Sequence, residues 1–463
     1  MTIPSSSLNN NASEQLAGFC ANLRFEDIPA DVIAHIKLSI LDGLGCCLVG
    51  STLPWTRKVR DMIDAEDAAP IASLLGSSDK VSLSGAILVN ATAGHAFELD
   101  DIHREAILHP NSIAVPVALN TAQFLGSASG KDILTAIIAG YEVGNRVGAA
   151  AGTDLLLRGF HPQGAVGPFC GAATASNMMR LNADKTRDAL GIAGSFGSGL
   201  MAAQEGAMVK RLHSGHAAEA GVRGALLAKR GFTGISDVVE AEYGGFLSTF
   251  SGGVNTERAT AGLGSTWETL ATGFKPHATV TSIHSALDAL GMIMRDNNLV
   301  VGDIAHIHAG VSHPTHVHCA WPYKAQSITA AQMNIYYGLA MIALFGVAFV
   351  QQFDADKISD PDVMAFTKCI TASVDPDIEA RGHAFRHMAR VRVETADGQT
   401  FEREVTHRRG SPENPISPAE VIAKFRTLAA SVLTPDATND VIIIVDTLDD
   451  QQDMSTLMQA LTP

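Results

Sequence analysis

Apolar side chains recur at helical spacing through the first half of the chain. In residues 30–49, one stripe holds Val32, Ile33, Ile36, Ile40, Leu41 and Leu44, and Pro29 suits a helix start. Segments with the same spacing occur at residues 13–23, 82–95, 112–125, 131–147, 164–179, 184–193 and 213–229. Runs such as Gly171 to Ser176 contain the small residues that let helices approach closely. The pattern therefore predicts that this half of the chain is entirely helical.

The pattern changes near residue 272. Residues 304–311 alternate like a strand, and the runs 389–395 and 400–405 flank Asp397-Gly398, a dipeptide typical of a β-hairpin turn. Helices are expected from about residue 282, at 336–350 and at 360–367, and helix returns after Pro415 and Pro418. We therefore predict a mainly α fold, in which a helical domain (1–271 and 410–463) contains an inserted, smaller α+β lid domain (272–409).

Charge and cysteine content narrow the classes of function. The 463-residue chain has a formal net charge of −15, and it lacks the clustered Lys and Arg that bind nucleic acid. Its six cysteines show no C-x-x-C pair and no zinc-ligand spacing, which is typical of a reduced cytoplasmic protein. Residues 1–15 are a polar, frayed tail without a signal-peptide core, and the apolar run 336–350 is shorter than the roughly 20 residues that cross a bilayer. These features predict a cytoplasmic protein with no nucleic-acid or membrane partner.

Acidic and imidazole groups are concentrated in residues 95–110, HAFELDDIHREAILHP. This stretch holds four carboxylates and three histidines, namely Glu98, Asp100, Asp101, Glu105, His95, His103 and His109. Only 17% of the chain is charged, so such a cluster beside apolar sequence indicates groups at the mouth of a pocket. The structural alternative is a polar loop that caps two helices.

Four further stretches place polar groups in apolar or glycine-rich sequence. They contribute His161 before Pro162 at a helix start; Lys210, Arg211, His213 and His216 before another helix; Lys275, His277 and His284 at the domain junction; and Tyr336 and Tyr337 at the head of an apolar helix. Helix starts favour anions, and clefts between domains are common binding sites. Each feature also has a structural explanation: a helix cap, a surface charge or a core aromatic.

Two clusters contain metal-ligand residue types. The first is Asp100, His103 and His109, and the second is His313, His316 and His318. If the second cluster lies on a strand, His313 faces away from the other two histidines. We therefore predict no bound metal.

Several of these motifs, taken in order, resemble the MmgE/PrpD family along nearly the whole chain. They are PADVIAHIKLSILDGLGCCLVG, HAFELDDIHREAILHP, RGFHPQGAVGPFCGAATA, VKRLHSGHAAEAG, the KP-x7-H of Lys275 to His284, and ENPISPAEVIAKF. The resemblance implies a large helical domain, a smaller lid, a homodimer and no cofactor. Members include 2-methylcitrate dehydratase, cis-aconitate decarboxylase and iminodisuccinate epimerase, so a small di- or tricarboxylate is the implied substrate.

The resemblance also implies roles for individual residues. Its HP histidine corresponds to His109 and its helix-start histidine to His161, both assigned to proton transfer. Its acidic pair corresponds to Asp100, which orients a histidine, and Asp101. Its two lysines correspond to Lys210 and Lys275, which bind substrate carboxylates, and its lid tyrosine to Tyr337. We include Tyr337 among the catalytic groups and His103 and Asp101 among the substrate-binding ones.

Two positions depart from the family pattern. Ile102 replaces a threonine, and Val280 stands where the decarboxylase-like members carry a histidine. These positions affect the groups that select the reaction, so we predict a dehydratase-type, carbon-oxygen lyase. The alternatives are an epimerase, isomerase or decarboxylase of a related dicarboxylate, and a noncatalytic carboxylate-binding protein.

Overall fold

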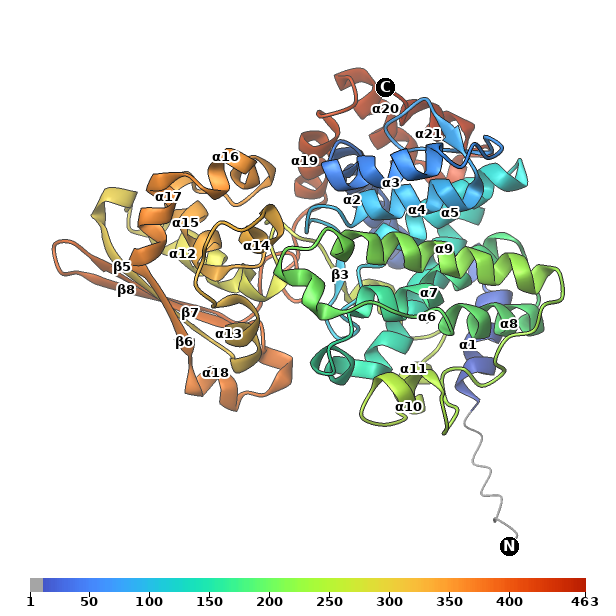
Figure 1. Cartoon of the computed structure of the whole chain (residues 1–463), viewed down its shortest axis with the longest axis horizontal. Coiled ribbons are helices and arrows are strands. Elements are labelled where there is room, and N and C mark those ends of the chain that lie inside the picture. The colour runs from blue at the N-terminus through green and yellow to red at the C-terminus, as the bar shows by residue number, and fades with distance from the viewer. Residues whose placement is uncertain (1–10) are drawn as a thin grey trace, which may run out of the picture.

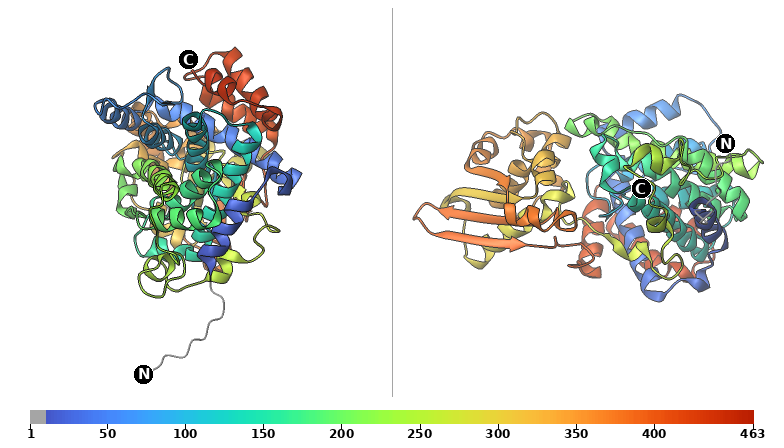
Figure 2. Two further views of the ribbon diagram at one scale, coloured as in Figure 1. Left: turned by 90° about the vertical axis from the view of Figure 1, so that its right-hand side faces the viewer. Right: turned by 90° about the horizontal axis from the view of Figure 1, so that it is seen from below.

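The chain folds into two lobes in the computed structural model, a larger helical lobe and a smaller α+β lobe (Figure 1). The model describes residues 11–463, so most of the predicted N-terminal tail lies outside the described residues. Seen from below, the α+β lobe stands to one side of the helical lobe (Figure 2). The predicted mainly α fold with a smaller α+β part is confirmed, whereas the lid role and the domain boundaries stay predictions.

Long helices build the larger lobe. They are α1 (Ala12–Asn22), α2 (Ala30–Ser51), α3 (Pro54–Asp64), α4 (Leu83–Gly94), α5 (Asn111–Leu125), α6 (Gly130–Leu157), α7 (Pro162–Met178), α8 (Ala183–Gly194) and α9 (Val209–Lys229), followed by short α10 (Phe246–Phe250) and α11 (Thr256–Thr260). Helix α6 begins with a capping box between Ser129 and Asp132 and runs ten residues past the predicted end at residue 147. It breaks at Gly152, whose φ of 60° is readily adopted only by glycine.

The packing of the helical lobe centres on α7. This helix lies against α5, α6, α8 and α9, and its interior is filled by small and aliphatic side chains. A Cβ added to Gly221 of α9 would lie 2.6 Å from the carbonyl carbon of Gly171 in α7. The two backbones therefore approach closely because neither residue has a side chain, as the glycine-rich sequence predicts.

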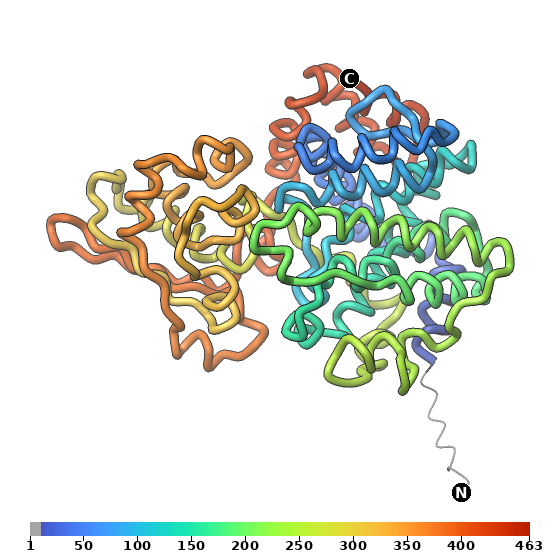
Figure 3. Tube along the Cα trace, viewed as in Figure 1, coloured from blue at the N-terminus to red at the C-terminus, as the bar shows by residue number. Residues whose placement is uncertain are grey.

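The chain leaves the helical lobe and later returns to it, as the Cα trace shows (Figure 3). After the α+β lobe it forms α19 (Pro418–Ala429), α20 (Pro435–Asp446) and α21 (Ser455–Ala460). Helix α19 packs on α2, where Phe425 joins the same apolar core as the N-terminal helices. The smaller lobe is thus inserted between two parts of the helical lobe.

A four-stranded sheet of order β6-β5-β7-β8 organises the smaller lobe. Its strands are β5 (Ile304–Val311), β6 (Ile370–Val374), β7 (Ala389–Thr395) and β8 (Thr400–Val405), and its helices are α12 (His284–Asp296), α13 (His313–Cys319), α14 (Ile328–Gln332), α15 (Ile335–Phe345), α16 (Ala355–Ile358), α17 (Pro361–Phe366) and α18 (Pro376–Ala380). Strands β7 and β8 pair antiparallel with Ala389 opposite Val405, and Gly398 takes a φ of 87° in their turn. The predicted hairpin is confirmed, whereas the sequence analysis missed β6.

Short strands tie the two lobes together. Strand β3 (Ile102–His103) pairs antiparallel with β4 (Thr272–Gly273), directly before the chain enters the α+β lobe. A second small hairpin joins β1 (Ala72–Ser73) to β2 (Lys80–Val81). The prediction that the first half is entirely helical was therefore wrong in detail. Pairing of β3 with β4 places the acid and imidazole cluster at the junction of the lobes.

Helix α2 is the one helix in residues 11–463 that is long and apolar enough to cross a membrane. However, 78% of its most apolar window is buried inside the protein, against α4, α5 and α19. A helix that is apolar on most of its surface is expected at the centre of a large core. We therefore interpret α2 as a core helix of the larger lobe.

Candidate functional site

A cavity of about 210 Å³ lies where the two lobes meet. Its charged and imidazole lining consists of Glu98, Arg104, His109, His161, Lys210, Lys275, His313, His318, His383, Arg386 and His387. Four side chains of Lys or Arg and six of His thus surround one carboxylate among the described lining residues. Since the whole protein carries a net charge of −15, this cavity is a local basic site suited to an anion.

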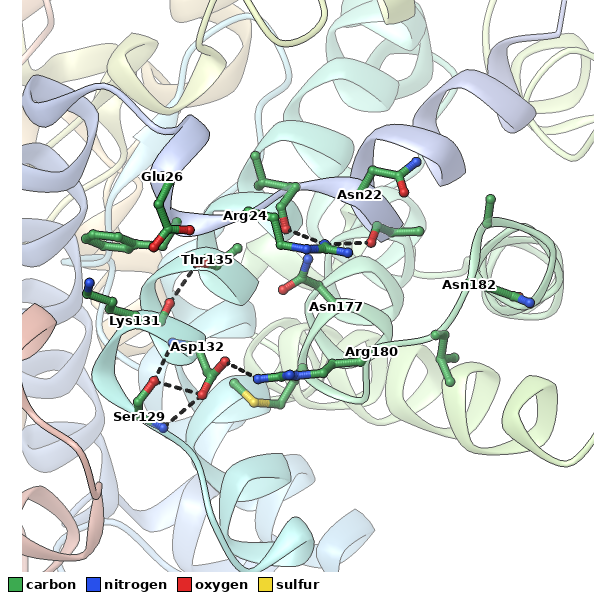
Figure 4. A pocket seen from close by; sticks show the side chains of 16 residues that line it. Asn22, Arg24, Glu26, Ser129, Lys131, Asp132, Thr135, Asn177, Arg180 and Asn182 are labelled. Atoms are coloured by element: carbon green, nitrogen blue, oxygen red, sulfur yellow. Dashed lines mark hydrogen bonds and ion pairs between the residues drawn. The ribbon is translucent and has the colours of Figure 1, made fainter.

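A wider cavity of about 570 Å³ lies elsewhere, between the α1–α2 connection, the start of α6 and the α7–α8 connection (Figure 4). Arg180 pairs with Asp132 at 3.0 Å there, and Arg24 donates to the carbonyl oxygens of Ala21 and Leu23. None of the site residues predicted from the sequence lines it. We therefore place the candidate site in the smaller cavity between the lobes.

Glu98 joins three cations at the base of the site. Its carboxylate accepts hydrogen bonds from Lys210, from Arg211 at 2.6 Å and from Lys275 at 3.3 Å. Burial opposes ionisation of Glu98, but the cations of Lys210, Lys275 and Arg211 hold its pKa well below the ordinary value. Burial lowers the pKa of Lys210 to about 8, despite the attraction of Glu98. Three cations against one carboxylate leave positive charge available for a ligand.

The backbone at Glu98 is itself unusual. This residue has a φ of 56°, a left-handed conformation that is uncommon for residues other than glycine. The conformation lies in the turn after α4, and it aims the carboxylate at the start of α9, where Lys210 and Arg211 lie. Such strained conformations concentrate at functional sites, because the surrounding structure must hold them.

His109 is held as a neutral base. Its Nδ1 lies 2.6 Å from the carbonyl oxygen of Asp101. A carbonyl oxygen only accepts, so Nδ1 carries the proton and Nε2 keeps its lone pair. Burial lowers the pKa of His109 to about 3, which keeps the ring uncharged at neutral pH. The amide of Gln163 accepts from the His109 backbone N–H at 2.9 Å and fixes the residue beside the start of α7.

His161 is paired with a second histidine. It precedes Pro162 at the start of α7, and its Nδ1 lies 2.8 Å from Nδ1 of His213, one turn after Lys210 on α9. Burial, with the nearby Lys210 charge, holds the pKa of His161 well below the ordinary value. The sequence analysis named His213 but gave it no role, because only the packing of α7 on α9 shows that the two rings meet.

Asp100 connects the histidines behind the cavity. Its carboxylate lies 2.7 Å from Nδ1 of His95, 3.5 Å from Nδ1 of His109 and 3.9 Å from the Lys275 ammonium. This position suits the orienting role that we predicted. His95, Asp100 and His109 also offer ligand atoms within 4.8 Å of one another. His95 thus replaces His103 in the metal-ligand set considered from the sequence, and the absence of a metal stays a prediction.

Besides Asp100, three predicted site residues do not line the cavity. His103 accepts from the Ala106 N–H at 3.1 Å and lies 2.9 Å from Glu268, on the side of β3 away from the lysines. Asp101 is fully buried, and its carboxylate accepts from Tyr141 at 2.6 Å and from the Asn111 N–H at 3.0 Å. Because these contacts occupy both side chains, we correct their assignment from substrate binding to structural support.

Tyr337 is the third residue that the cavity does not include. Its ring is buried in the core of the smaller lobe against Tyr323 and Phe353, and its hydroxyl donates to the carbonyl oxygen of Gln352. Burial raises its pKa above the ordinary value. Apolar surroundings and a satisfied hydroxyl describe a core aromatic, so we withdraw the catalytic role assigned to Tyr337.

The smaller lobe contributes two histidines that the sequence offered only as metal ligands, and one arginine that it did not indicate. The histidine-rich stretch is helix α13 and not a strand, because Ser312 caps it and Pro314 occupies its first turn. His313 and His318 line the cavity, whereas His316 does not. Arg386 lies between α18 and β7 and also lines the cavity. Its segment gives no sequence signal, because it reaches the site only when the lobes pack together.

Comparisons with known proteins cover both lobes. The models of the MmgE/PrpD N-terminal and C-terminal domains match residues 14–259 and 277–450. A cis-aconitate decarboxylase-like protein of Aspergillus oryzae is 33% identical, over 100% of this chain and 99% of its own length. The cis-aconitate decarboxylase of Aspergillus terreus is 32% identical, over 98% of this chain and 97% of its own length. The cis-aconitate decarboxylase of Homo sapiens is 28% identical, over 97% of this chain and 94% of its own length.

Proposed function

The chain belongs to the MmgE/PrpD family, and on that basis we propose that it is a lyase that removes carbon dioxide from a small unsaturated tricarboxylate such as cis-aconitate. The family resemblance in the sequence predicted an enzyme of this kind, with decarboxylation as one of its alternatives. Similarity to cis-aconitate decarboxylases over nearly full length now favours that alternative above dehydration.

The observation that carries the proposal is the convergence of four residues on one basic cavity. Lys210, Lys275, His109 and His161 come from separate parts of the chain and all line the same space. Ammonium groups in a buried site bind carboxylates strongly, and neutral imidazoles accept and relay protons. This combination supports chemistry at a carbon atom next to a carboxylate.

The proposed reaction needs charge stabilisation and one proton. When the bond to one carboxylate breaks, carbon dioxide leaves and its electron pair shifts into the adjacent carbon-carbon bond. The original double bond then moves its electrons toward the carbon next to another carboxylate, where the ammonium groups of Lys210 and Lys275 stabilise the developing charge. A proton added to that carbon completes the product, so one proton is consumed for each carbon dioxide released.

Lys210 is the group best matched to supply this proton. With its pKa lowered to about 8, it is mostly protonated at neutral pH but gives up a proton more readily than an exposed lysine. His109 and His161 are neutral because burial lowers the pKa of each ring. We propose that these neutral histidines orient the substrate, while Glu98 holds Lys210 in place.

Dehydration remains a second candidate because of two lining residues. Ile102 and Val280 line the cavity. By the family resemblance, Ile102 replaces a threonine of the family pattern, and Val280 stands where decarboxylase-like members carry a histidine. A neutral His109 beside the Lys210 ammonium also provides the base and the acid that elimination of water requires. The homodimer, the lid motion and the cytoplasmic location stay proposals from the sequence.

Proton NMR in D2O distinguishes the two reactions. The full chain is incubated separately with cis-aconitate and with 2-methylcitrate. Decarboxylation yields carbon dioxide and a dicarboxylate with one deuterium on carbon, whereas dehydration converts 2-methylcitrate into an unsaturated tricarboxylate without loss of carbon dioxide. If neither acid reacts, and citrate and related acids are also unchanged, the proposed function is wrong.

A further inference from the structure

Arg386 is a buried cation. Among the described residues, no carboxylate lies at ion-pair distance from its guanidinium. Its side chain lines the cavity, and the residue is 8% exposed. The guanidinium donates to the backbone carbonyl oxygen of Arg104 at 2.5 Å and lies 3.4 Å from Nδ1 of His383. Both contacts are to neutral groups, so neither neutralises the charge.

Two carboxylates near this part of the site are already held by other arginines. Glu105, which acts on Arg386 only through space, makes two hydrogen bonds with Arg258, at 2.9 and 2.5 Å. Glu413 pairs with Arg104 at 2.8 Å. These pairs leave Arg386 without an acidic partner in residues 11–463.

An unpaired buried charge is unfavourable unless an ion of opposite sign joins it. Burial lowers the pKa of Arg386 to about 10, so the guanidinium is still charged at neutral pH. Transfer of a lone charge away from water is costly, and an anion in the cavity offsets that cost. Arginine is also the side chain whose two parallel N–H groups match a carboxylate.

Arg386 and the two lysines approach the cavity from different lobes. Lys210 lies at the start of α9 in the helical lobe, and Lys275 follows β4 at the junction, and both contact Glu98. Arg386 follows α18, the helix that lies below the sheet in Figure 1, in the α+β lobe. A ligand bound by all three therefore contacts both lobes.

We propose that Arg386 forms a second carboxylate subsite in this cavity. Lys210 and Lys275 bind other carboxylates of a tricarboxylate, and Arg386 binds the remaining one. The inference rests on the proposed function and extends it, because it makes the number of carboxylates a determinant of specificity. A dicarboxylate that lacks the carboxylate bound by Arg386 leaves this arginine unpaired and binds more weakly than the tricarboxylate.

A purely structural role for Arg386 makes a different prediction. In that case the guanidinium only fastens the lobes through the Arg104 carbonyl, and its removal weakens every ligand alike. The two roles are separated by comparing binding after removal of the arginine, after removal of one carboxylate from the ligand, and after removal of both. Tricarballylate, glutarate and methylsuccinate suit this purpose, since each dicarboxylate lacks one carboxylate of the tricarboxylate.

Calorimetric titration of wild type and Arg386→Gln with these three acids is the test. We expect the variant to bind tricarballylate roughly tenfold or more weakly. At least one of the two dicarboxylates should bind to the variant and to wild type with dissociation constants within about twofold of each other, because it lacks the carboxylate that Arg386 holds. The matched control is Arg403→Gln, which removes an exposed arginine of β8 that pairs with Asp296 at the end of α12, and it should bind like wild type.

Equal weakening of all three acids, or unchanged binding of tricarballylate, overturns the subsite. If Arg386→Gln does not fold by circular dichroism, Arg386→Lys replaces it in the same titrations, because it keeps the charge but loses the paired N–H groups. Failure of wild type to bind any of the acids instead contradicts the proposed function, so the two failures are distinguishable.

Discussion

His161 and His213 face each other through their Nδ1 atoms, which lie 2.8 Å apart. At that distance one nitrogen must donate and the other must accept, so a single proton is held between the two rings. His213, which does not line the cavity, thereby fixes which nitrogen of His161 carries a proton. The pair links a buried ring of the site to a partly exposed ring of α9.

Replacement of His213 should impair turnover more than binding. In His213→Phe, His161 loses the partner that fixes its tautomer, and we expect kcat to fall about tenfold with KM changed less than about twofold. Steady-state kinetics measure both values. His216→Phe, at an exposed position one turn along α9, is the control. Equal kinetics in the two variants would show that the histidine pair has no part in the reaction.

The rate should fall as the pH rises through about 8, where Lys210 loses its proton. The ammonium form is present below that pKa and donates the proton, and the neutral amine above it does not. Lys210→Arg keeps a charge that cannot be given up, so we expect at least about a hundredfold lower kcat and no decline near pH 8. A pH–rate profile of wild type that stays level to about pH 10 would exclude Lys210 as the donor.

The protein should lose stability in mild acid because its buried histidines are neutral. Burial lowers the pKa of His95, His109 and His161 below the ordinary value of 6.5. At a pH between the lowered pKa and the ordinary pKa of a histidine, the unfolded chain binds a proton that the folded protein does not. Each such histidine then lowers the free energy of unfolding by on the order of 1 kcal/mol for each pH unit below 6.5.

Urea unfolding at about pH 7 and about pH 5.5 measures this loss. His95→Gln removes one of these titrating rings and should make stability less dependent on pH. Identical free energies of unfolding at the two pH values would mean that these rings are protonated in the folded protein.

Tyr337→Phe should leave catalysis intact. The Tyr337 hydroxyl donates to a carbonyl oxygen inside the smaller lobe, away from the cavity. We expect kcat/KM to stay within about twofold of wild type and the free energy of unfolding to drop by about 1 kcal/mol. Kinetics and urea unfolding of the purified variant test both values. A large loss of kcat with unchanged stability would restore the role predicted from the sequence.

Much of the fold follows from local sequence. Strands β5, β7 and β8 have the predicted bounds, because alternating side chains and the Asp397-Gly398 turn specify them directly. Helix α13 was missed because a run of histidines suggested an exposed strand, although Ser312 and Pro314 form a helix start. Strand β6 was missed because its pairing with β5 is parallel and joins distant parts of the chain.

The site was only partly predictable for the same physical reason. The density of acids and histidines pointed to a segment that does line the cavity, and the family motifs named two lysines that line it too. The direction of each side chain depends on long-range pairing, however. Strand β3 pairs with β4 and turns His103 toward Glu268, while Asp100 stays beside His109. Arg386 belongs to the cavity only through the packing of the two lobes.

The central claim is that Lys210 and Lys275 bind substrate carboxylates in the cavity between the lobes. A crystal structure of the protein with tricarballylate, which lacks the double bond of cis-aconitate, tests it most directly. The account predicts the ligand in this cavity, with carboxylate oxygens roughly 3 Å from both ammonium groups. A ligand bound at another site, with this cavity free of it at a saturating concentration, would contradict the account.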